Sequence, residues 1–535
     1  MSETFDHIIV GAGSAGCVLA NRLSADPRNR VLLLEAGGKD DWIWFHIPVG
    51  YLFTIGDPRA DWMFETQAIP GLNGRTLKYP RGKVIGGSSA INAMIYMRGQ
   101  AADYDGWRQR GLEGWGWDDV LPLFLAQEDH IAPPTEHHRS GGEWRVEYPR
   151  MRWDVLDAFA EAAALEGIPP VIDFNGGDNS GAGYFQVNQK AGVRWSAARG
   201  FLKPVLGRPN LRLETGAQVT RVLVENGRAV GVAWTRDGRS FEARAEGEVV
   251  LAAGAVATPR LLELSGIGDG ARLAALGLDT LRHLPGVGEN LQDHLQIRPV
   301  FRVEGVSTMN ALYASLWRRP LMALEYALLR RGPMSMAPSQ LGAFARSSPG
   351  RATANLQFHV QPLSLDRFGE PLHPFPAITI SVCNLRPTSR GSIHASSPDP
   401  LAAPLIQPDY LSTAEDERVA VESLKLVRRI VARAPLARFS PRQHGPGAEA
   451  TTDEALLAAA RDLGTTIFHP VGTARMGLAG DPLAVVDARL RVHGLGGLRI
   501  ADASVMPAIV SGNTNSPTMM IAEKAARMII EDGSA

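Results

Sequence analysis

The chain has 535 residues, of which 45% are hydrophobic and 21% are charged, a composition typical of a globular protein with two or three domains. The formal net charge of −1 gives no indication of nucleic-acid binding, and we expect none. With two cysteines, Cys17 and Cys383, the chain offers neither a disulfide framework nor a cysteine-ligated metal site, and no metal is expected.

A dinucleotide-binding fingerprint lies at the start of the chain. An apolar strand, Phe5 to Val10, leads into the turn Gly11-Ala12-Gly13-Ser14-Ala15-Gly16, which opens a helix. A second apolar strand then ends at Glu35 and is followed by Ala36. The order of strand, glycine-rich turn, helix, strand and acid is the context that this fingerprint requires.

Each part of the fingerprint has a physical task. Gly11 permits the tight turn, Gly13 lets the backbone approach a pyrophosphate, and Gly16 lets the helix pack closely on the strand. Ser14 and Ala15 lie at the helix N-terminus, whose free N–H groups and dipole favour phosphate. Glu35 can accept hydrogen bonds from ribose hydroxyls, and its charge disfavours NADP.

The elements that follow indicate a discontinuous α/β domain. Val219 to Val232 predicts a hairpin with its turn at Asn226-Gly227. A buried strand over Glu248 to Leu251 precedes a helix that we expect to begin near Thr258, with Pro259 in its first turn. The remaining expected elements are a strand at Leu498 to Ala501, a final helix at about Ser516 to Ile530, and second-domain strands at Leu356 to Val360 and Ile378 to Val382.

No signal peptide or membrane-spanning segment is expected, because Phe5 to Val10 is a core strand and no uncharged apolar run reaches about 18 residues. The stretch Leu312 to Leu329 (LYASLWRRPLMALEYALL) is apolar and helical in pattern, but Arg318, Pro320 and Glu325 interrupt it. We expect a packed helix here; a lid or a surface-binding helix is the alternative. The expected location is cytoplasmic, with peripheral contact to the inner membrane left open.

Further motifs carry a resemblance to a known family. They are Gly82-Lys83-Val84-Ile85-Gly86-Gly87-Ser88-Ser89-Ala90-Ile91-Asn92, Gly254 to Gly268 (GAVATPRLLELSGIG), Pro285 to His294 (PGVGENLQDH) and Phe468 to Gly477 (FHPVGTARMG). Together with the fingerprint, these motifs resemble the glucose–methanol–choline (GMC) oxidoreductases over essentially the whole chain. Trp42 to Tyr51 and Gly512 to Ala526 are most similar to the bacterial choline-dehydrogenase and alcohol-dehydrogenase branch.

The resemblance implies the GMC fold: an α/β, Rossmann-like FAD-binding domain and an α+β substrate domain with an antiparallel sheet. The FAD-binding domain is expected at residues 1–150, 205–300 and 460–535, and the substrate-binding domain at 151–204 and 301–459. It also implies FAD rather than NAD as the cofactor. Some family members attach FAD covalently through a histidine, but this chain has Ile91 at that place, so noncovalent FAD is predicted.

By resemblance, several residues beyond the fingerprint are expected to contact FAD. Val219 is expected to meet the adenine through its main chain, Asn92 to Ile95 to run along the flavin ring, and Asp502-Ala503 to touch the pyrophosphate and ribityl chain. Asn515 is either a flavin contact or a turn or cap residue. The full predicted set is Gly11, Gly13, Ser14, Ala15, Gly16, Glu35, Ala36, Val84, Gly87, Ser88, Asn92, Ala93, Met94, Ile95, Val219, Asp502, Ala503, Asn515, Pro517 and Thr518.

The resemblance also assigns the catalytic pair. His469, in the HPVGT motif, is expected to lie over the flavin and to take the hydroxyl proton of an alcohol as general base. Asn513 is expected to hold the substrate oxygen with it. Phe468 is assigned to the substrate pocket or, equally, to core packing. We expect His294 to have a structural role, and the sequence leaves the role of His359 open.

The predicted activity is oxidation of a primary alcohol to an aldehyde by hydride transfer to flavin N5, with electrons passed to a quinone or another acceptor. An oxygen-using alcohol oxidase that produces hydrogen peroxide shares every motif. Choline dehydrogenase is a further alternative, although Leu295-Gln296 follows Asp293-His294 where an acid would be expected for choline. A lyase or photodecarboxylase on the same fold is the remaining alternative. The oligomeric state is not predicted.

Overall fold

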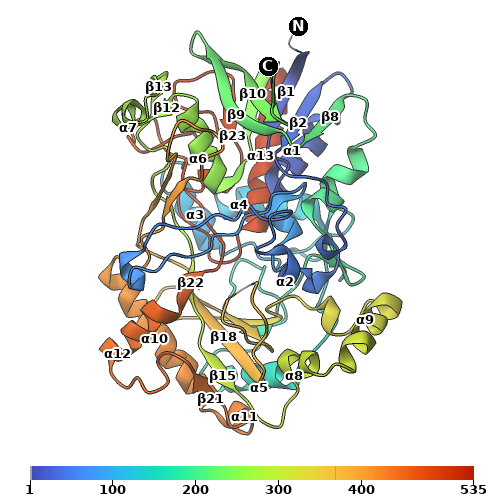
Figure 1. The fold of residues 1–535 in the computed structure, drawn as a ribbon, viewed down its shortest axis with the longest axis vertical. Helices are drawn as coiled ribbons and strands as arrows, with labels where there is room; N and C mark the ends of the chain where they lie inside the picture. Colours follow the sequence, from blue (N-terminus) through green and yellow to red (C-terminus); the bar gives the residue numbers. More distant parts are fainter. Residues whose placement is uncertain (1–2, 368, 535) are drawn as a thin grey trace.

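The computed structural model describes residues 3–367 and 369–534. Two sheets organise these residues: one lies in the upper half of Figure 1, with both ends of the chain, and the other lies in the lower half. Each sheet has its own cluster of buried apolar side chains. The upper cluster surrounds the fingerprint strands, and the lower one fills the space between the second sheet and its helices.

The upper sheet has seven strands in the order β8-β2-β1-β11-β10-β9, with β23 paired to β11. The pairs β8–β2, β2–β1, β1–β11 and β11–β23 are parallel, whereas β10 pairs antiparallel with both neighbours. The strand bounds are β1 Glu3–Val10, β2 Val31–Glu35, β8 Leu211–Thr215, β9 Gln218–Glu225, β10 Arg228–Arg236, β11 Arg239–Leu251 and β23 Leu498–Ile500.

The expected hairpin is confirmed as β9 and β10, with Glu225 opposite Arg228. Its two turn residues, Asn226 and Gly227, have φ values of 50° and 72°. Left-handed backbone at both positions is what a two-residue hairpin turn needs, and asparagine and glycine tolerate it best. The sequence signal was strong here because the requirement is entirely local.

Helices α1 (Ser14–Leu23) and α13 (Asn515–Ser534) pack against each other beside the upper sheet, as Figure 1 shows. The fingerprint order β1, turn, α1, β2 and the final helix are therefore confirmed. The expected start of the helix near Thr258 is wrong: α6 runs from Gly254 to Leu264, and Pro259 lies inside it. The reason is long-range, because the carboxylate of Asp502 accepts a hydrogen bond from Gly254 N at 2.8 Å and fixes the earlier start.

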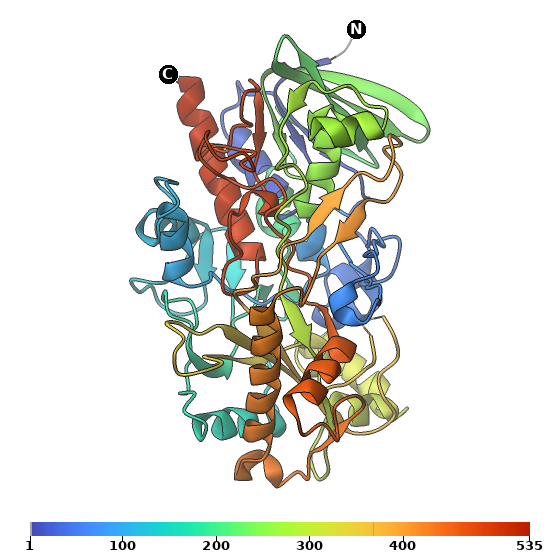
Figure 2. The same cartoon turned by 90° about the vertical axis from the view of Figure 1, so that its left-hand side faces the viewer.

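The lower sheet has eight strands, antiparallel throughout, in the order β21-β15-β18-β17-β16-β5, with β14 joining β18 to β22. Helix α10 (Ala414–Val431) packs on β18 and runs along the lower half of Figure 2. The strand bounds are β5 Gly181–Tyr184, β14 Leu295–Ile297, β15 Val300–Arg302, β16 Leu341–Ala345, β17 Leu356–Gln361, β18 Ala377–Asn384, β21 Arg442–His444 and β22 Gly464–Thr466.

The two sheets confirm the expected fold class, with a Rossmann-like parallel sheet and a second, antiparallel one. The expected strands in the second part appear as β17 and β18. Strands β14 and β22 pair within the lower sheet, although the predicted boundaries assign residues 205–300 and 460–535 to the FAD-binding domain. The domain boundaries themselves remain a prediction.

The expectation of a packed helix over Leu312 to Leu329 is wrong. The stretch forms two helices, α8 (Met309–Ala314) and α9 (Arg318–Leu329), and α9 projects from the right-hand side of the molecule in Figure 1. Tyr326 is the buried residue of α9, while Leu321 and Leu328 are 63% and 72% exposed. The apolar pattern marks a face that avoids water, and the fold leaves that face uncovered.

Shorter elements complete the two halves of the molecule and the region between them. The remaining helices are α2 Tyr51–Thr54, α3 Ala101–Arg108, α4 Trp117–Gln127, α5 Asp154–Ala164, α7 Gly270–Ala275, α11 Ala434–Ala437 and α12 Asp453–Leu463. The remaining strands are β3 Glu128–His130, β4 Trp144–Val146, β6 Gln189–Lys190, β7 Val193–Arg194, β12 Ile267–Gly268, β13 Arg282–His283, β19 Ser392–His394 and β20 Leu405–Gln407. Within residues 3–367 and 369–534, no helix has the length and apolar character needed to cross a bilayer.

Candidate active site

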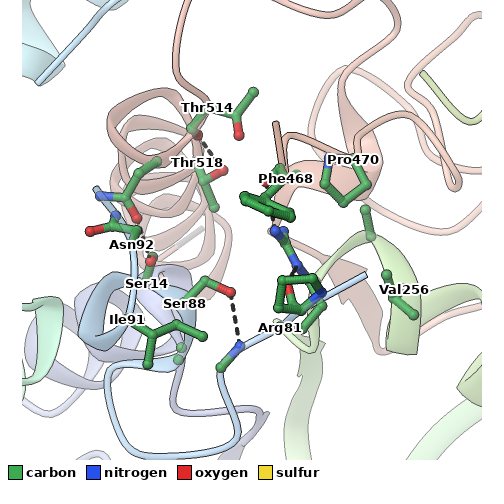
Figure 3. A pocket seen from close by; sticks show the side chains of 18 of the residues that line it. Ser14, Arg81, Ser88, Ile91, Asn92, Val256, Phe468, Pro470, Thr514 and Thr518 are labelled. Carbon is green, nitrogen blue, oxygen red and sulfur yellow. Dashed lines mark hydrogen bonds between the residues drawn. The ribbon is translucent and has the colours of Figure 1, made fainter. Parts of the chain in front are cut away.

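One cavity extends from the fingerprint turn in the upper sheet to β17 in the lower sheet, and Figure 3 shows part of its wall. Most of the residues selected from the sequence line it, although they come from segments spread over the whole chain. The predicted residues in its wall are Gly11, Gly13, Ser14, Ala15, Glu35, Ala36, Gly87, Ser88, Asn92, Ala93, Met94, Ile95, Val219, Phe468, His469, Asp502, Ala503, Asn513, Asn515 and Thr518.

Three predicted residues are not among those that line the cavity: Gly16, Val84 and Pro517. Gly16 acts by packing, because a Cβ at this position would lie 1.8 Å from the carbonyl oxygen of Gly11. Only glycine lets α1 approach the turn so closely. Val84 is fully buried and pairs with Gly38, and Pro517 lies in the first turn of α13.

At one end of the cavity, Glu35 is tied to the fingerprint turn. Its carboxylate accepts hydrogen bonds from Ala12 N at 2.8 Å and from Gly37 N at 2.7 Å. Burial raises the pKa of Glu35 to about 7, although both backbone N–H groups oppose the shift. Each carboxylate oxygen keeps a free lone pair, so Glu35 can still accept hydrogen bonds from a ligand hydroxyl.

Two glycine-rich segments touch where the cavity narrows between its ends. A Cβ at Gly87, whose φ is +52°, would lie 2.7 Å from the Cα of Gly13. The backbones of the fingerprint turn and of the segment Gly82 to Asn92 therefore meet in direct contact, which leaves main-chain groups facing the cavity. Ser88 fixes the second segment by accepting a hydrogen bond from Gly82 N at 3.1 Å, drawn in Figure 3.

The backbone from Asn92 to Ile95 runs along the cavity wall in a constrained shape. Met94 has φ of 60°, an uncommon value for a residue with a side chain, and its N–H donates to the Asn92 side chain at 2.9 Å. Arg194 is 1% exposed and donates to both the carbonyl oxygen and the side-chain oxygen of Asn92, at 2.7 and 3.0 Å. Sequence reasoning missed Arg194, because nothing local connects it to Asn92.

Phe468 and His469 lie in a strained turn at the other end of the cavity. Phe468 has φ of 71° and is held by two hydrogen bonds: its N–H donates to the Thr466 hydroxyl at 2.7 Å, and its carbonyl oxygen accepts from Arg81 at 2.6 Å. Left-handed backbone at an aromatic residue costs about 1–3 kcal/mol and persists where the surroundings over-determine it. Here the strain directs the His469 ring into the cavity.

Asp293 anchors this turn from behind. It is 4% exposed and accepts a hydrogen bond from the backbone N–H of His469 at 2.8 Å. Its other oxygen accepts from the hydroxyls of Thr466, Tyr79 and Tyr410. Burial raises the pKa of Asp293, and these hydroxyls lower it. The carboxylate thus fixes the main chain of His469 without reaching its ring.

The predicted pair His469 and Asn513 lies together, with Asn513 Nδ2 3.0 Å from His469 Nε2. The amide is oriented from the lower sheet, since Gln357 on β17 donates to Asn513 Oδ1 at 3.2 Å. Its NH2 group must therefore donate toward His469. Burial and the neighbouring His294 and His359 hold the pKa of His469 well below its usual value of 6.5, so the ring is neutral at neutral pH.

His294 determines which nitrogen of His469 carries the proton. His294 Nε2 lies 3.3 Å from the carbonyl oxygen of Leu385, which can only accept, so this nitrogen donates. Burial lowers the pKa of His294 to about 4, so its Nδ1 is bare and accepts from His469 Nδ1 at 3.1 Å. The free lone pair of His469 is therefore on Nε2, which faces Asn513. The sequence suggested a structural role for His294 and not this contact.

The cavity end around His469 combines aromatic and polar side chains with the guanidinium of Arg81. His359 is 2% exposed, and its Nε2 has no hydrogen-bond partner within residues 3–367 and 369–534. Burial lowers the pKa of His359 to about 3, so this ring is neutral as well. Lining residues that the sequence did not indicate include Tyr51, Trp62, Phe64, Arg81, Val256, Gln296, Ser339, Gln361 and Thr514.

Asp502 and Asn515 connect elements around the middle of the cavity. Asp502 accepts hydrogen bonds from Gly254 N and from the Thr258 hydroxyl, at 2.8 and 2.7 Å, and so joins β23 to the start of α6. Asn515 is the first residue of α13 and accepts from the Ser14 hydroxyl at 2.6 Å. The two helix N-termini of α1 and α13 therefore meet at the cavity wall, where their N–H groups favour a negatively charged ligand.

The wall fits an elongated dinucleotide. Glu35 offers a hydroxyl acceptor at one end, the bare glycine backbones and helix N-termini of the middle suit a pyrophosphate, and Asn92 to Ile95 line a further part of the wall. A Cβ on Gly87 would close the gap to Gly13. FAD has its ribose, phosphates and ring in this order, so the donor set and the cradle match it.

Family models describe both parts of the chain. The N-terminal model for "GMC oxidoreductase" matches residues 5–296, and the C-terminal model with the same description matches residues 387–522. The matched regions together contain the fingerprint, the segment Gly82 to Asn92, and both His469 and Asn513.

Named relatives are similar over nearly their whole length. The chain is 42% identical to "Alcohol dehydrogenase [acceptor]" of Pseudomonas putida, covering 98% of this chain and 96% of the relative. It is 40% identical to the mitochondrial choline dehydrogenase of Homo sapiens, covering 98% and 90%. Among solved structures, pyridoxine 4-oxidase from Mesorbium loti has a TM-score of 0.87 at 33% identity and covers 98% of each chain.

Proposed function

The chain belongs to the GMC oxidoreductase family of FAD-dependent enzymes, and on this basis we propose that it oxidises a primary alcohol to an aldehyde and passes the electrons to a quinone or another acceptor. The observation that carries the proposal is the pair His469 and Asn513 at the end of the cavity. A neutral imidazole with its lone pair beside an amide donor suits an alcohol, which must lose a proton as it is oxidised.

The residues divide the work as follows. The alcohol oxygen binds between His469 Nε2 and Asn513 Nδ2, and replaces the direct 3.0 Å contact between them. His469 accepts the hydroxyl proton at Nε2, while His294 holds the opposite proton on Nδ1. Asn513 donates to the oxygen as negative charge develops on it. Bound FAD supplies the acceptor for the hydride of the carbinol carbon.

The binding of FAD is assigned to the cavity wall described above, and we propose that it is noncovalent. Ile91, which lines the cavity and is 3% exposed, lies where some family members have a histidine for covalent attachment. An aliphatic side chain has no nucleophilic atom with which to form that bond. FAD should therefore leave the protein when it is denatured, and mass spectrometry of the released chain should show no added cofactor.

The substrate end of the cavity favours an uncharged alcohol over choline. Among the described residues that line the cavity, the carboxylates are Glu35, which is tied to the fingerprint turn, and Asp502, which is tied to the start of α6. Gln296, near His469, is neutral and donates to the Thr466 carbonyl oxygen at 2.9 Å. A quaternary ammonium group would find no carboxylate among the described lining residues around His469.

The test is anaerobic mixing of the FAD-loaded protein with primary alcohols of increasing chain length, benzylic alcohols and choline, followed by admission of air. We expect uncharged primary alcohols to bleach the oxidised-flavin absorbance faster than choline does. Reoxidation should be slow in air and fast with a soluble quinone. Fast recovery of the flavin absorbance in air, with formation of hydrogen peroxide, would identify oxygen rather than a quinone as the electron acceptor. Faster bleaching by choline than by the other alcohols would identify a choline dehydrogenase. If no alcohol bleaches the flavin, alcohol oxidation is refuted in favour of a lyase or photodecarboxylase.

A further inference from the structure

Helix α9 carries an exposed apolar stripe along one face. Trp317, the residue that caps its N-terminus, and Leu321, Leu324 and Leu328 follow one another at steps of four, three and four residues, which places them on one side of a helix. Their side chains are 85%, 63%, 55% and 72% exposed. We call these four residues the α9 stripe. Single exposed leucines are ordinary, but a continuous stripe that includes a tryptophan indicates an interaction surface.

The opposite face of α9 holds the helix to the body and keeps the stripe outward. Tyr326 is 3% exposed, and its hydroxyl donates to the carbonyl oxygen of Gly192 at 2.9 Å. Side chains two positions apart on a helix point about 160° away from each other, so Tyr326 lies on the face opposite Leu324 and Leu328. Figure 1 shows α9 projecting from the side of the molecule.

Arginines flank α9 at both ends. Two of them pack on aromatic rings: Arg319 lies 4.1 Å from the ring of Tyr313, and Arg330 lies 5.0 Å from that of Tyr326. Arg318 and Arg319 follow Trp317 directly, and Arg330 and Arg331 follow the last turn of α9. All four arginines are exposed, and between residues 313 and 331 the single acid is Glu325. An apolar face with a tryptophan at one end and arginines at both ends is complementary to a lipid surface, where acyl chains meet anionic headgroups.

We propose that the α9 stripe docks this protein on the surface of a bilayer that contains anionic lipids. The helix of 12 residues is about 18 Å long, which is too short to cross a hydrocarbon core of about 30 Å, so it lies in the plane of the interface. The leucines enter the acyl region, Trp317 sits at headgroup level, and Arg318 and Arg331, one at each end of α9, bind lipid phosphates.

A second copy of the chain is a poorer occupant of the stripe. A face about 18 Å long and about 10 Å wide offers roughly 200 Å², whereas a stable interface buries about 800 Å² on each partner. Two-fold pairing of antiparallel α9 helices would also bring Arg318 and Arg319 against the partner copy's arginines at the other helix end, and these like charges repel. A bilayer imposes neither limit.

The docking helix is connected to the cavity wall. From the end of α9 the chain passes through a short 3-10 turn at Pro333–Ser335 and reaches Pro338 and Ser339, which line the cavity. The docking helix and this part of the cavity wall are therefore joined by a short segment of chain. Binding itself requires no turnover, so its test is independent of the proposed function.

The test is flotation of the FAD-loaded, full-length protein with two kinds of vesicle: phosphatidylcholine alone, and an equal mixture of phosphatidylcholine and phosphatidylglycerol. The stripe variant is Leu324→Glu/Leu328→Glu. Its matched control is Leu165→Glu/Leu401→Glu, which changes leucines that are 58% and 70% exposed elsewhere on the surface. Flavin absorbance and sedimentation velocity without lipid are measured on every sample.

The expected result is that the wild type and the control variant float with the mixed vesicles, while the stripe variant floats at least tenfold less. High salt should weaken flotation with the mixed vesicles, and so should substitution by glutamine of Arg318, Arg319, Arg330 and Arg331. Neither change should alter how much protein floats with vesicles of phosphatidylcholine alone. The proposal is overturned if the wild type does not float, or if the stripe variant floats equally well. It is also overturned if the wild type is a dimer without lipid and the stripe variant is a monomer, which would assign the stripe to self-association.

Discussion

His469, the proposed base, is held by two neighbours that act on different atoms. Asp293 holds its backbone N–H, and His294 accepts the proton of its Nδ1. Because His294 has its own donor committed to the Leu385 carbonyl oxygen, only one arrangement of protons satisfies all three hydrogen bonds. The site thus selects the tautomer of His469 before any substrate binds.

This tautomer control predicts different effects of two substitutions at His294. His294→Leu removes the acceptor for His469 Nδ1–H, and we expect flavin reduction to slow by roughly 10- to 1,000-fold, since loss of a tautomer-fixing partner in a catalytic triad reaches about 10⁴. His294→Gln keeps an acceptor oxygen and should recover much of the rate. Anaerobic stopped-flow reduction at equal FAD content measures both. Equal rates for the two variants, fast or slow, would contradict a tautomer role.

Glu35 gives a pH-dependent prediction for cofactor binding. Burial raises its pKa to about 7, and the ionised form is the better hydrogen-bond acceptor for ribose hydroxyls. The affinity of the cofactor-free protein for FAD should therefore rise as pH increases through about 7 and then level off. A hydrogen bond to a charged acceptor is stronger than one to a neutral acceptor by about 1 kcal/mol, so the affinity for FAD should change about fivefold.

Titration of the protein with FAD, followed by quenching of FAD fluorescence over a pH series, measures this effect. Glu35→Gln should bind FAD more weakly and without the step near pH 7. Glu113→Gln, which changes an exposed acid outside the cavity wall, should behave like the wild type. A wild-type affinity that is flat across neutral pH would mean that Glu35 is not the ribose acceptor.

The sequence indicated His469, Asn513 and the fingerprint residues because each belongs to a short pattern with a fixed spacing. It did not indicate the residues that hold them. Arg194 reaches Asn92 across 102 positions of the chain, and Asp293 reaches His469 across 176. Such pairings follow from the fold, and no local pattern predicts them.

At the scale of elements, prediction succeeded where local physics decides the outcome. The Asn226-Gly227 hairpin follows from backbone conformations that few residues adopt. The start of α6 was wrong because Asp502, far along the chain, accepts a hydrogen bond from Gly254 N. Helix α9 was expected to pack because apolar spacing reports only that a face avoids water. It does not distinguish a protein core from a lipid surface.

For the whole molecule, the two sheets explain why the site residues are so dispersed. The upper sheet contributes the fingerprint and Glu35, while the lower sheet contributes His359 and the Gln357 that orients Asn513. The loops between the sheets bring Asn92, His469 and Asn513 to the same cavity. The resemblance to the family predicts that these distant segments meet at one site, whereas the composition and periodicity of the chain do not.

The most direct test of the account is single-turnover reduction of the FAD-loaded His469→Ala variant by the best alcohol substrate under anaerobic conditions. The matched control is His283→Ala, an exposed histidine on β13. The account predicts that both variants retain FAD, that His283→Ala reduces its flavin at the wild-type rate, and that His469→Ala is slower by about 10²- to 10⁴-fold. Reduction of the His469→Ala flavin within a few-fold of the wild-type rate would contradict the assignment of His469 as the base.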